Sequence, residues 1–363
     1  MASPTLYVAI TNHGFGHATR TASVVAEIQK QCPAIKIIVA TTAPQWLLES
    51  YIPNPVAYRL RSFDIGVIQS DSVTMDKAAT LEKLQQIRDN QASMIADEVA
   101  FMHQEKVSLV LADIPPLAAP IARAAGIPCW MMSNFGWDLI YREWGGNFVE
   151  MADWIDTCFR QCDRLFRLPF HEPMSSFPVI EDVGLTGGEP RFSNDALRET
   201  WNITAPLDKT VLLTFGGLGL TQIPYEGLQR FPDWQFITFD RNASDLPNVL
   251  VIADRQYRPV DIMPLCSRIV SKPGYGTFSE ACRLGTPIVS IERDGFAEST
   301  FLLDGIRHYA HHQILKPSQL FDGTWDFLHH PMCPPKQESS RMAQNLATNG
   351  NEAIARAVID YLT

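Results

Sequence analysis

Short apolar runs alternate with stretches of helical periodicity along the first half of the chain. The runs that have the length of buried strands cover residues 6–10, 35–40, 108–112, 128–132 and 165–168. The segments with helical periodicity cover residues 18–31, 46–51, 76–104, 117–125 and 147–162. Strands that alternate with helices in this way are typical of a parallel sheet with helices on both faces. Residues 61–75 fit neither pattern and form an excursion.

The second half repeats this alternation after a segment rich in Pro, Gly and acidic residues, 169–191. Its predicted strands cover residues 210–215, 234–239, 249–252, 269–270 and 287–291. Residues 313–337 are predicted to be irregular, and residues 339–362 to form a helix. The pattern therefore predicts an α/β protein with two Rossmann-like, doubly wound domains, 1–186 and 187–338. A terminal helix, 339–363, is expected to return to the first domain.

Ligands of doubly wound sheets bind at the carboxyl ends of the strands, so we expect a cleft where those ends face each other. In the second domain the segment 271–280, Ser-Lys-Pro-Gly-Tyr-Gly-Thr-Phe-Ser-Glu, follows a predicted strand. We read it as a tight turn and a new helix with Thr277 as its N-cap. Such a helix start can hold a phosphate, and Glu280 one turn later could accept hydrogen bonds from a ribose. Alternatively, the glycines only allow close packing.

Two histidines follow the first strand, in Thr-Asn-His-Gly-Phe-Gly-His-Ala-Thr-Arg over residues 11–20. Histidine suits proton transfer near neutral pH, and we prefer His17 over His13 as a base because it lies beside the helix start. Asp113 ends a nearby strand and could orient His17, as general-base activation of a hydroxyl requires. The alternatives are that the histidines bind the loop backbone and that Asp113 caps the next helix.

Further strand ends carry weaker signals. Gly216 and Gly217 could approach a diphosphate or form a plain turn, and the carboxylates of the loop 293–298 could bind sugar hydroxyls or solvent. Trp46, Trp137, Tyr141 and Trp144 could offer a stacking surface or simply pack. No Asp-x-Asp pair stands at a strand end and no Walker lysine motif is present, so we expect neither a metal site nor a cofactor.

The chain has 363 residues and a formal net charge of −10 without a long basic run. This disfavours nucleic acid and anionic membranes as partners. Its seven cysteines are scattered and are expected to be reduced thiols. No apolar run is long enough for a transmembrane segment and no signal-peptide pattern begins the sequence, so we expect a cytoplasmic protein.

Taken in order, Gly16-His17, Ala112-Asp113, Phe215-Gly216-Gly217 and Lys272 to Glu280 resemble the GT-B glycosyltransferases, in particular the branch with MurG and the plant UDP-sugar transferases. The resemblance implies that His17 is the base and Asp113 its partner, and that Glu280 binds the ribose. It implies a donor site made of Gly216, Gly217, Lys272, Gly274, Tyr275, Gly276, Thr277, Glu280, Arg293, Asp294 and Glu298.

The segments 14–20, 133–138 and 167–169, with Arg293-Asp294, are similar to the N-terminal, GT-like domain of plant L-arabinokinases. This similarity places an acceptor side at His13, Gly16, Arg20, Asn134 and Asp138. Two features depart from the larger family. Arg293-Asp294 and Glu298 stand where that family has its sugar-binding acid and glutamine, and Phe-Gly-His-x-x-Arg also resembles nucleotide-sugar hydrolases of the same fold.

The resemblance implies a metal-independent glycosyltransferase that moves a sugar from a nucleotide sugar, with UDP as the expected nucleotide, to an acceptor hydroxyl with inversion. The nucleotide sugar is a co-substrate, and the acceptor is not identified. Two alternatives stay open. One is a nucleotide-sugar hydrolase with the same base, and the other is a non-catalytic module that binds nucleotide sugars.

Overall fold

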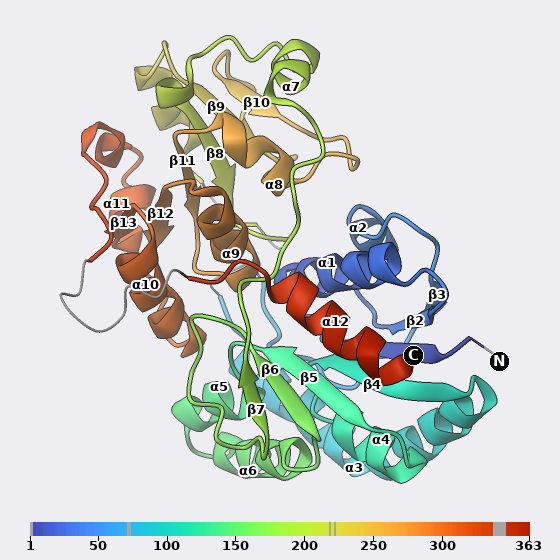
Figure 1. The fold of residues 1–363 in the computed structure, drawn as a ribbon. Helices are drawn as coiled ribbons and strands as arrows, with labels where there is room; N and C mark the ends of the chain where they lie inside the picture. The colour runs from blue at the N-terminus through green and yellow to red at the C-terminus, as the bar shows by residue number, and fades with distance from the viewer. Residues whose placement is uncertain (1–2, 71–73, 218, 221–222, 337–345) are drawn as a thin grey trace.

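The structure is a computed structural model that describes residues 3–70, 74–217, 219–220, 223–336 and 346–363 (Figure 1). The first half of the chain forms a seven-stranded parallel sheet in the order β3-β2-β1-β4-β5-β6-β7. Its strands are β1 (Thr5–Ile10), β2 (Lys36–Ala40), β3 (Ala57–Arg59), β4 (Val107–Asp113), β5 (Cys129–Ser133), β6 (Arg164–Arg167) and β7 (Ile180–Asp182). Its helices are α1 (Gly16–Gln31), α2 (Gln45–Glu49), α3 (Lys77–Gln104), α4 (Ala118–Ala125), α5 (Trp137–Trp144) and α6 (Phe148–Phe159).

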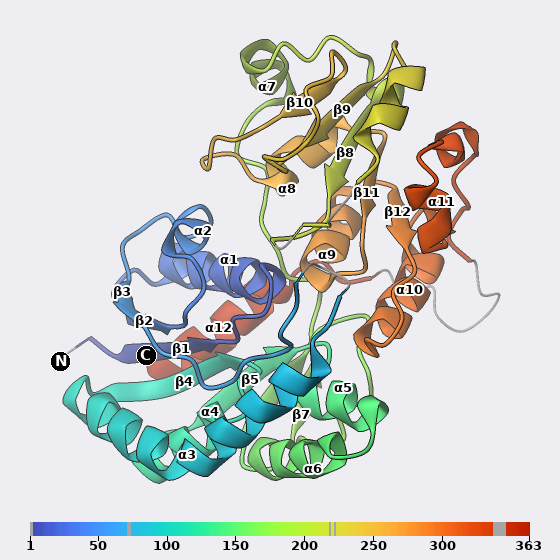
Figure 2. The ribbon, with the colours of Figure 1, turned by 180° about the vertical axis from the view of Figure 1, so that it is seen from behind.

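Helices cover both faces of this sheet because its strands are apolar on both sides. Along β1, Leu6 and Val8 pack into one buried cluster, and Tyr7 and Ala9 into another on the opposite face. Helices α3, α4 and α6 lie on one face, and α1 lies on the other beside the terminal helix (Figures 1 and 2).

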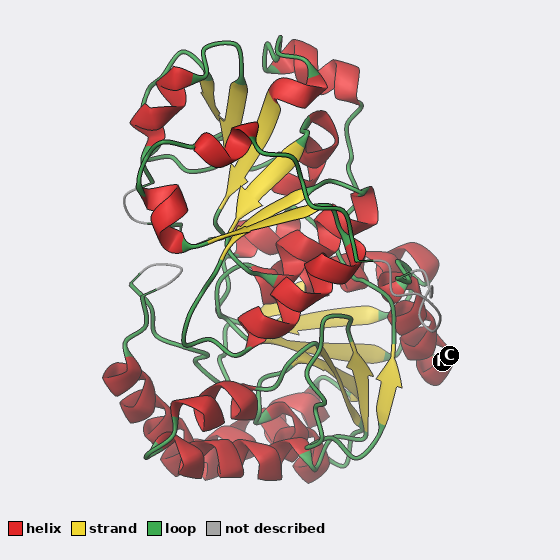
Figure 3. Ribbon diagram, turned by 90° about the vertical axis from the view of Figure 1, so that its left-hand side faces the viewer, coloured by secondary structure: helices red, strands yellow, loops and turns green. Residues whose placement is uncertain are grey.

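The second half forms a six-stranded sheet in the order β10-β9-β8-β11-β12-β13, in which every neighbouring pair is parallel. Figure 3 shows the strands of the two sheets as separate groups, each with helices around it. The strands are β8 (Thr210–Thr214), β9 (Gln235–Thr238), β10 (Val249–Val251), β11 (Arg268–Ser271), β12 (Ile288–Ile291) and β13 (His312–Leu315). The helices are α7 (Asn194–Thr200), η1 (Leu207–Lys209), η2 (Tyr225–Arg230), α8 (Pro259–Ile262), η3 (Met263–Leu265), α9 (Tyr275–Leu284), α10 (Glu298–Tyr309), α11 (Pro317–Phe321) and η4 (Asp326–His329).

The expected fold class is confirmed, and so is the return of the terminal helix to the first domain. Helix α12 (Gly350–Leu362) packs beside α1, and Tyr361 contacts Trp130 of β5 with ring centroids 5.2 Å apart. Among the described residues, no helix combines the length and apolarity of a membrane span.

Several element boundaries differ from the sequence-based expectation. Residues 313–337 are not irregular throughout, because β13, α11 and η4 lie in or overlap this range. These elements are short and proline-bearing, so no clear periodicity marks them. The predicted terminal helix begins at Gly350 rather than at residue 339, and residues 337–345 lie outside the described residues.

Both sheets reverse their strand order at one point, and these two points position the site. In the first sheet the reversal lies between β1 and β4, and in the second between β8 and β11. Loops that leave neighbouring strands in opposite directions open a crevice there. Asp113 ends β4, His13 and His17 lie in the loop after β1 and in the first turn of α1, and the loops after β8 and β11 carry the Gly216-Gly217 turn and the segment before α9.

Candidate functional site

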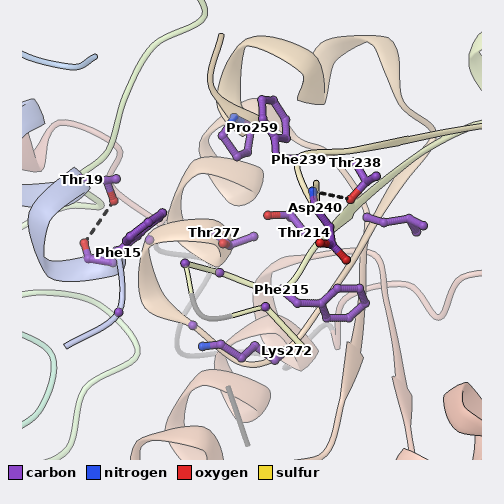
Figure 4. Close-up of a pocket in the computed structure, with 18 of the residues that line it drawn as sticks. Phe15, Thr19, Thr214, Phe215, Thr238, Phe239, Asp240, Pro259, Lys272 and Thr277 are labelled. Atoms are coloured by element: carbon purple, nitrogen blue, oxygen red, sulfur yellow. Dashed lines mark hydrogen bonds between the residues drawn. The ribbon is translucent and has the colours of Figure 1, made fainter. Parts of the chain in front are cut away.

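A cavity of about 840 Å³ is lined by loops from both sheets. Lys272 lies at one end of the view in Figure 4, and Phe239 and Pro259 lie toward the other, with Thr277 between them. Phe15 and Thr19 reach in from the first domain. The cavity has the size and mixed lining of a small-molecule site.

His17 and Asp113 meet at the edge of this cavity. The parallel register of β1 and β4 pairs Ile10 with Asp113, and His17 lies in the first turn of α1, which follows β1. His17 Nδ1 lies 2.7 Å from Asp113 Oδ1. A proton on Nδ1 that is donated to this carboxylate leaves Nε2 as the basic nitrogen. His17 lines the cavity with 6% of its surface exposed, whereas Asp113 is fully buried.

Arg20 binds the same carboxylate. Its Nε lies 2.6 Å from Asp113 Oδ2 and one terminal nitrogen lies 2.5 Å from Oδ1, while Thr21 Oγ1 donates to Oδ2 at 2.9 Å. Burial opposes ionisation of Asp113, but the charges of Arg20 and His17 outweigh it and lower the pKa of this carboxyl to about 2. Asp113 is therefore a carboxylate shared by a histidine and an arginine. The alternative of a helix cap is excluded, because α4 has no side-chain cap.

The second histidine has a different environment. His13 Nδ1 accepts a hydrogen bond from the Val67 backbone N–H at 3.2 Å, and its ring stacks on Phe296 with centroids 5.8 Å apart. Burial, followed by repulsion from His17 in its protonated form and from the charges of Arg293 and Lys272, holds the pKa of His13 well below its usual value. His13 is thus a neutral ring whose Nδ1 is already engaged, although it lines the cavity.

Helix α9 begins three residues earlier than expected. Gly274 is its N-cap and Thr277 is its third residue, so Thr277 is not the cap. Gly274, Gly276 and Thr277 line the cavity at the helix start, where unpaired N–H groups and the positive end of the dipole favour an anion. Tyr275 lines it too, but its hydroxyl accepts a hydrogen bond from the Thr186 N–H at 3.3 Å.

Lys272 adds a positive charge at this helix start. Burial and, to a smaller extent, the nearby charge of Arg293 lower its pKa to about 8, although the charge of Glu298 opposes this shift. An anion in the cavity would favour the protonated amine, because opposite charges at close range stabilise the ionised form.

Three glycines allow the two domains to approach each other around the cavity. A Cβ at Gly276 would lie 3.3 Å from Thr19 Oγ1 and 3.4 Å from the Cα of Gly16, so the first turns of α1 and α9 are in contact. A Cβ at Gly217 would overlap the Phe15 ring. The positive ends of two helices therefore converge on one cavity wall.

Glu280 lines the cavity and binds groups outside its own helix. Its Oε1 accepts hydrogen bonds from Tyr51 Oη at 3.2 Å and from the Gly188 N–H at 3.0 Å. Burial raises its pKa to about 7, and the bonds from Gly188 and Tyr51 together with the charge of Arg258 only partly offset that effect. Glu280 thus links α9 to the first domain and to the connecting segment.

Helix α10 is connected to Arg20 of the first domain through its first residue, Glu298. Glu298 Oε1 accepts a hydrogen bond from Asn134 Nδ2 at 2.9 Å, and Asn134 Oδ1 accepts one from Arg20 at 2.8 Å. Arg293 packs over the Phe296 ring, with its guanidinium carbon 4.0 Å from the centroid. Arg293 and Glu298 line the cavity.

Four expected site residues do not line the cavity: the fully buried Asp113, Asn134, Asp138 and Asp294. Asn134 is buried behind it, Asp294 is exposed, and Asp138 binds Ser176 Oγ at 2.9 Å inside the first domain. Trp137 and Tyr141 are buried in the packing of α5 rather than offering a stacking surface. Trp144 also lies outside the cavity and donates to the Gly295 carbonyl at 2.8 Å. In the described part of the chain, no group of three or more His, Cys, Asp or Glu side chains could hold a metal ion.

The cavity also contains residues to which the sequence analysis gave no role. They share no motif. Tyr51 follows α2, Gln69 lies between β3 and α3, Thr238 and Asp240 lie at and after the end of β9, and Arg255 and Arg258 lie between β10 and α8. Of the four aromatic residues predicted to offer a stacking surface, only Trp46 lines the cavity.

Comparisons with known proteins address the fold. No family model matches the chain. Over 330 residues it is 31% identical to an L-arabinokinase of Arabidopsis thaliana, an alignment that covers 87% of this chain and 31% of that protein. The chain thus matches about a third of the length of this curated relative.

Solved structures match over nearly the whole chain. The glycotransferase of kitacinnamycin has a TM-score of 0.65 at 15% identity and full coverage of both chains. A UGT transferase from Siraitia grosvenorii in complex with UDP has a TM-score of 0.56 at 15% identity, with 98% of this chain and 100% of that chain covered. MurG of Acinetobacter baumannii has a TM-score of 0.55 at 12% identity, with 99% of each chain covered. The chain therefore has the GT-B fold, as the resemblance of its motifs implied.

Proposed function

We propose that this protein is a metal-independent GT-B glycosyltransferase that transfers a sugar from a UDP-sugar to an acceptor hydroxyl. One observation carries the proposal: His17, which is paired with the buried Asp113, and a glycine-lined helix start with a lysine line the same cavity. The first is suited to activating a hydroxyl, and the second to holding a diphosphate. In this proposal residues 1–186 bind the acceptor, residues 187–338 bind the donor, and residues 339–363 tie the two together.

The proposed reaction is a single displacement. His17 Nε2 takes the proton of the acceptor hydroxyl while its oxygen attacks the anomeric carbon of the sugar, and the bond from that carbon to the diphosphate oxygen breaks. Asp113 stabilises the imidazolium, and Arg20 holds Asp113 in place. Lys272 and the start of α9 stabilise the departing diphosphate. One displacement inverts the configuration at the anomeric carbon.

The donor site follows from the same geometry. Gly274, Gly276 and Thr277 would hold the diphosphate, with Gly216 and Gly217 beside it, and Glu280 would bind the ribose. Arg293 and Glu298 would lie near the sugar. The choice of UDP is supported by structural neighbours whose complexes contain UDP, UDP-glucose or a fluorinated UDP-glucose. No kinase activity is proposed, since the matched segment is 31% of the L-arabinokinase chain.

A thermal-shift screen of nucleoside diphosphates and nucleotide sugars tests the donor site, because a ligand of the native state raises its apparent stability. We expect a UDP-sugar to stabilise the wild type and to lose this effect in Glu280→Ala. No response to any nucleotide would overturn the proposal.

Product analysis then separates the alternatives. Transfer requires an added acceptor, such as a pool of alcohols and glycosides, and yields a new glycoside. Free sugar formed without an acceptor would instead identify a nucleotide-sugar hydrolase. Saturable binding without turnover would identify a binding module.

A further inference from the structure

Helix α2 belongs to the first domain, yet it closes one side of the cavity against the second domain. Trp46, Leu47, Ser50 and Tyr51 line the cavity, and all lie in α2 or in the two residues after it. The opposite wall there consists of the loop after β10 and the start of α8, including Arg255, Tyr257 and Pro259.

Two cation–π contacts cross between these walls. The guanidinium carbon of Arg255 lies 4.8 Å from the centroid of the Trp46 ring, and that of Arg258 lies 4.5 Å from the Tyr51 ring. The rings of Trp46 and Phe15 form a T-shaped pair, with centroids 5.6 Å apart and an interplanar angle of 82°. Trp46 is thus held in place by groups of both domains and is only partly buried, so an aromatic surface is fixed at the cavity wall.

The position of this surface indicates which part of a ligand it would meet. Tyr51 Oη donates to Glu280, the residue proposed to bind the ribose, at 3.2 Å. In Figure 4, Lys272 lies at the opposite end of the view from Pro259, which belongs to the wall that faces α2, and Thr277 of the α9 start lies between them. Lys272 and the start of α9 would hold the diphosphate. A group attached to the ribose on the side away from the phosphates is the nucleobase, a flat aromatic ring that gains from stacking on an indole.

We propose that α2 forms part of the nucleoside site, with Trp46 packing against the base, so that the nucleotide is held by both domains. This inference rests on the proposed function. It adds a recognition element from the first domain to a donor site otherwise built from the second, and it couples nucleotide binding to contact between the two domains.

The test uses the full chain and UDP, with two readouts. Isothermal titration calorimetry gives the affinity, which we expect Trp46→Ala to lower about tenfold or more, as for loss of a base–aromatic contact. Tryptophan emission gives proximity, since a base stacked on an indole quenches it. Trp46→Phe keeps a stacking ring, so we expect it to bind UDP within about threefold of the wild type but to lose the quench.

Trp154 of α6 provides the control, because it is partly buried, binds Gln91 and does not line the cavity. Trp154→Phe should keep both the affinity and the quench. Wild-type UDP affinity in Trp46→Ala, or an undiminished quench in Trp46→Phe, would overturn the inference while the proposed function stands. If UDP and the other nucleoside diphosphates fail to bind the wild type, the proposed donor site fails, and this inference fails with it.

Discussion

Arg20 and Asp113 form a bidentate ion pair inside the first domain, with Nε 2.6 Å from Oδ2 and a terminal nitrogen 2.5 Å from Oδ1. Both side chains are at least 98% buried, and the same guanidinium reaches Asn134 and lies 5.1 Å from the Tyr275 ring centroid. Arg20 therefore connects the proposed catalytic pair, His17 and Asp113, to the first turn of α9.

We expect Arg20→Met to destabilise the protein by about 3–5 kcal/mol, because it leaves Asp113 buried without its main counter-charge. The stability of Arg20→Lys should lie between those of Arg20→Met and the wild type, since lysine keeps the charge but cannot make the bidentate contact. Urea unfolding measures both. Arg142→Met breaks an exposed pair with Asp153 and should cost less than about 1 kcal/mol. A cost for Arg20→Met no larger than that of this control would contradict the buried pair.

His17→Ala should lower turnover by about 10²- to 10⁴-fold, the usual contribution of a general base. Nucleotide affinity should change little, since the helix start and Lys272 remain. The matched control is His13→Asn, because the asparagine side-chain oxygen can still accept a hydrogen bond from the Val67 N–H. Its turnover should fall by less than about tenfold. Steady-state rates and calorimetry provide the two readouts. Equal losses in both variants would remove His17 from its proposed role.

The pKa of Lys272, about 8, predicts how nucleotide binding depends on pH. A lysine is charged below its pKa, so affinity for UDP should be greatest near pH 7 and decline as pH rises through about 8. Lys272→Met should bind about ten- to hundredfold more weakly at pH 7, the loss expected for a charged contact, and vary little up to pH 9. Lys272→Arg should keep its affinity at pH 9. A parallel decline in Lys272→Met would assign the pH effect to another group.

Glu280 predicts how the stability of the protein depends on pH, because its folded-state pKa of about 7 lies above the ordinary 4.5. Below pH 4.5 the carboxyl is protonated in both states and costs nothing. Between about 4.5 and 7 the unfolded chain releases the proton first, so the wild type loses stability as pH rises. Glu280→Gln removes this titration.

Urea unfolding of the wild type and Glu280→Gln at pH 4.5 and pH 8 measures the effect. The difference in unfolding free energy should move in favour of the variant by up to about 3 kcal/mol over that range. A difference that stays constant with pH would show that folding does not raise the pKa of Glu280.

Asn134 and Glu298 should be energetically coupled, because their 2.9 Å hydrogen bond joins a loop of the first domain to α10 of the second. In a double-mutant cycle of Asn134→Ala and Glu298→Ala, we expect a coupling free energy of about 1–3 kcal/mol. Asn248 offers the control, since it is buried but binds the carbonyls of Leu228 and Phe231 instead. Asn248→Ala combined with Glu298→Ala should be additive, and additivity in the first pair would show that their contact contributes nothing.

Much of the fold followed from the sequence because buried parallel strands are continuous apolar runs. The runs at 6–10, 108–112 and 269–270 were found within two residues of their true bounds. Strand β3, by contrast, is an edge strand with exposed residues, so no apolar run marked it. The early start of α9 was missed because Gly274 caps it through its backbone conformation, without a side-chain bond.

The general location of the cavity could be predicted without the structure. Alternating strands and helices specify parallel sheets, and the carboxyl ends of neighbouring strands then bring residues such as His17 and Asp113 together. The other contacts of those residues depend on how the chain packs in three dimensions. Arg20 contacts Asp113, which lies 93 positions later in the sequence, and Tyr51 contacts Glu280, which lies 229 positions later. Both contacts depend on how sheets and domains pack. Local periodicity carries no information on such distances, because it records which face of an element is buried and not which partner buries it.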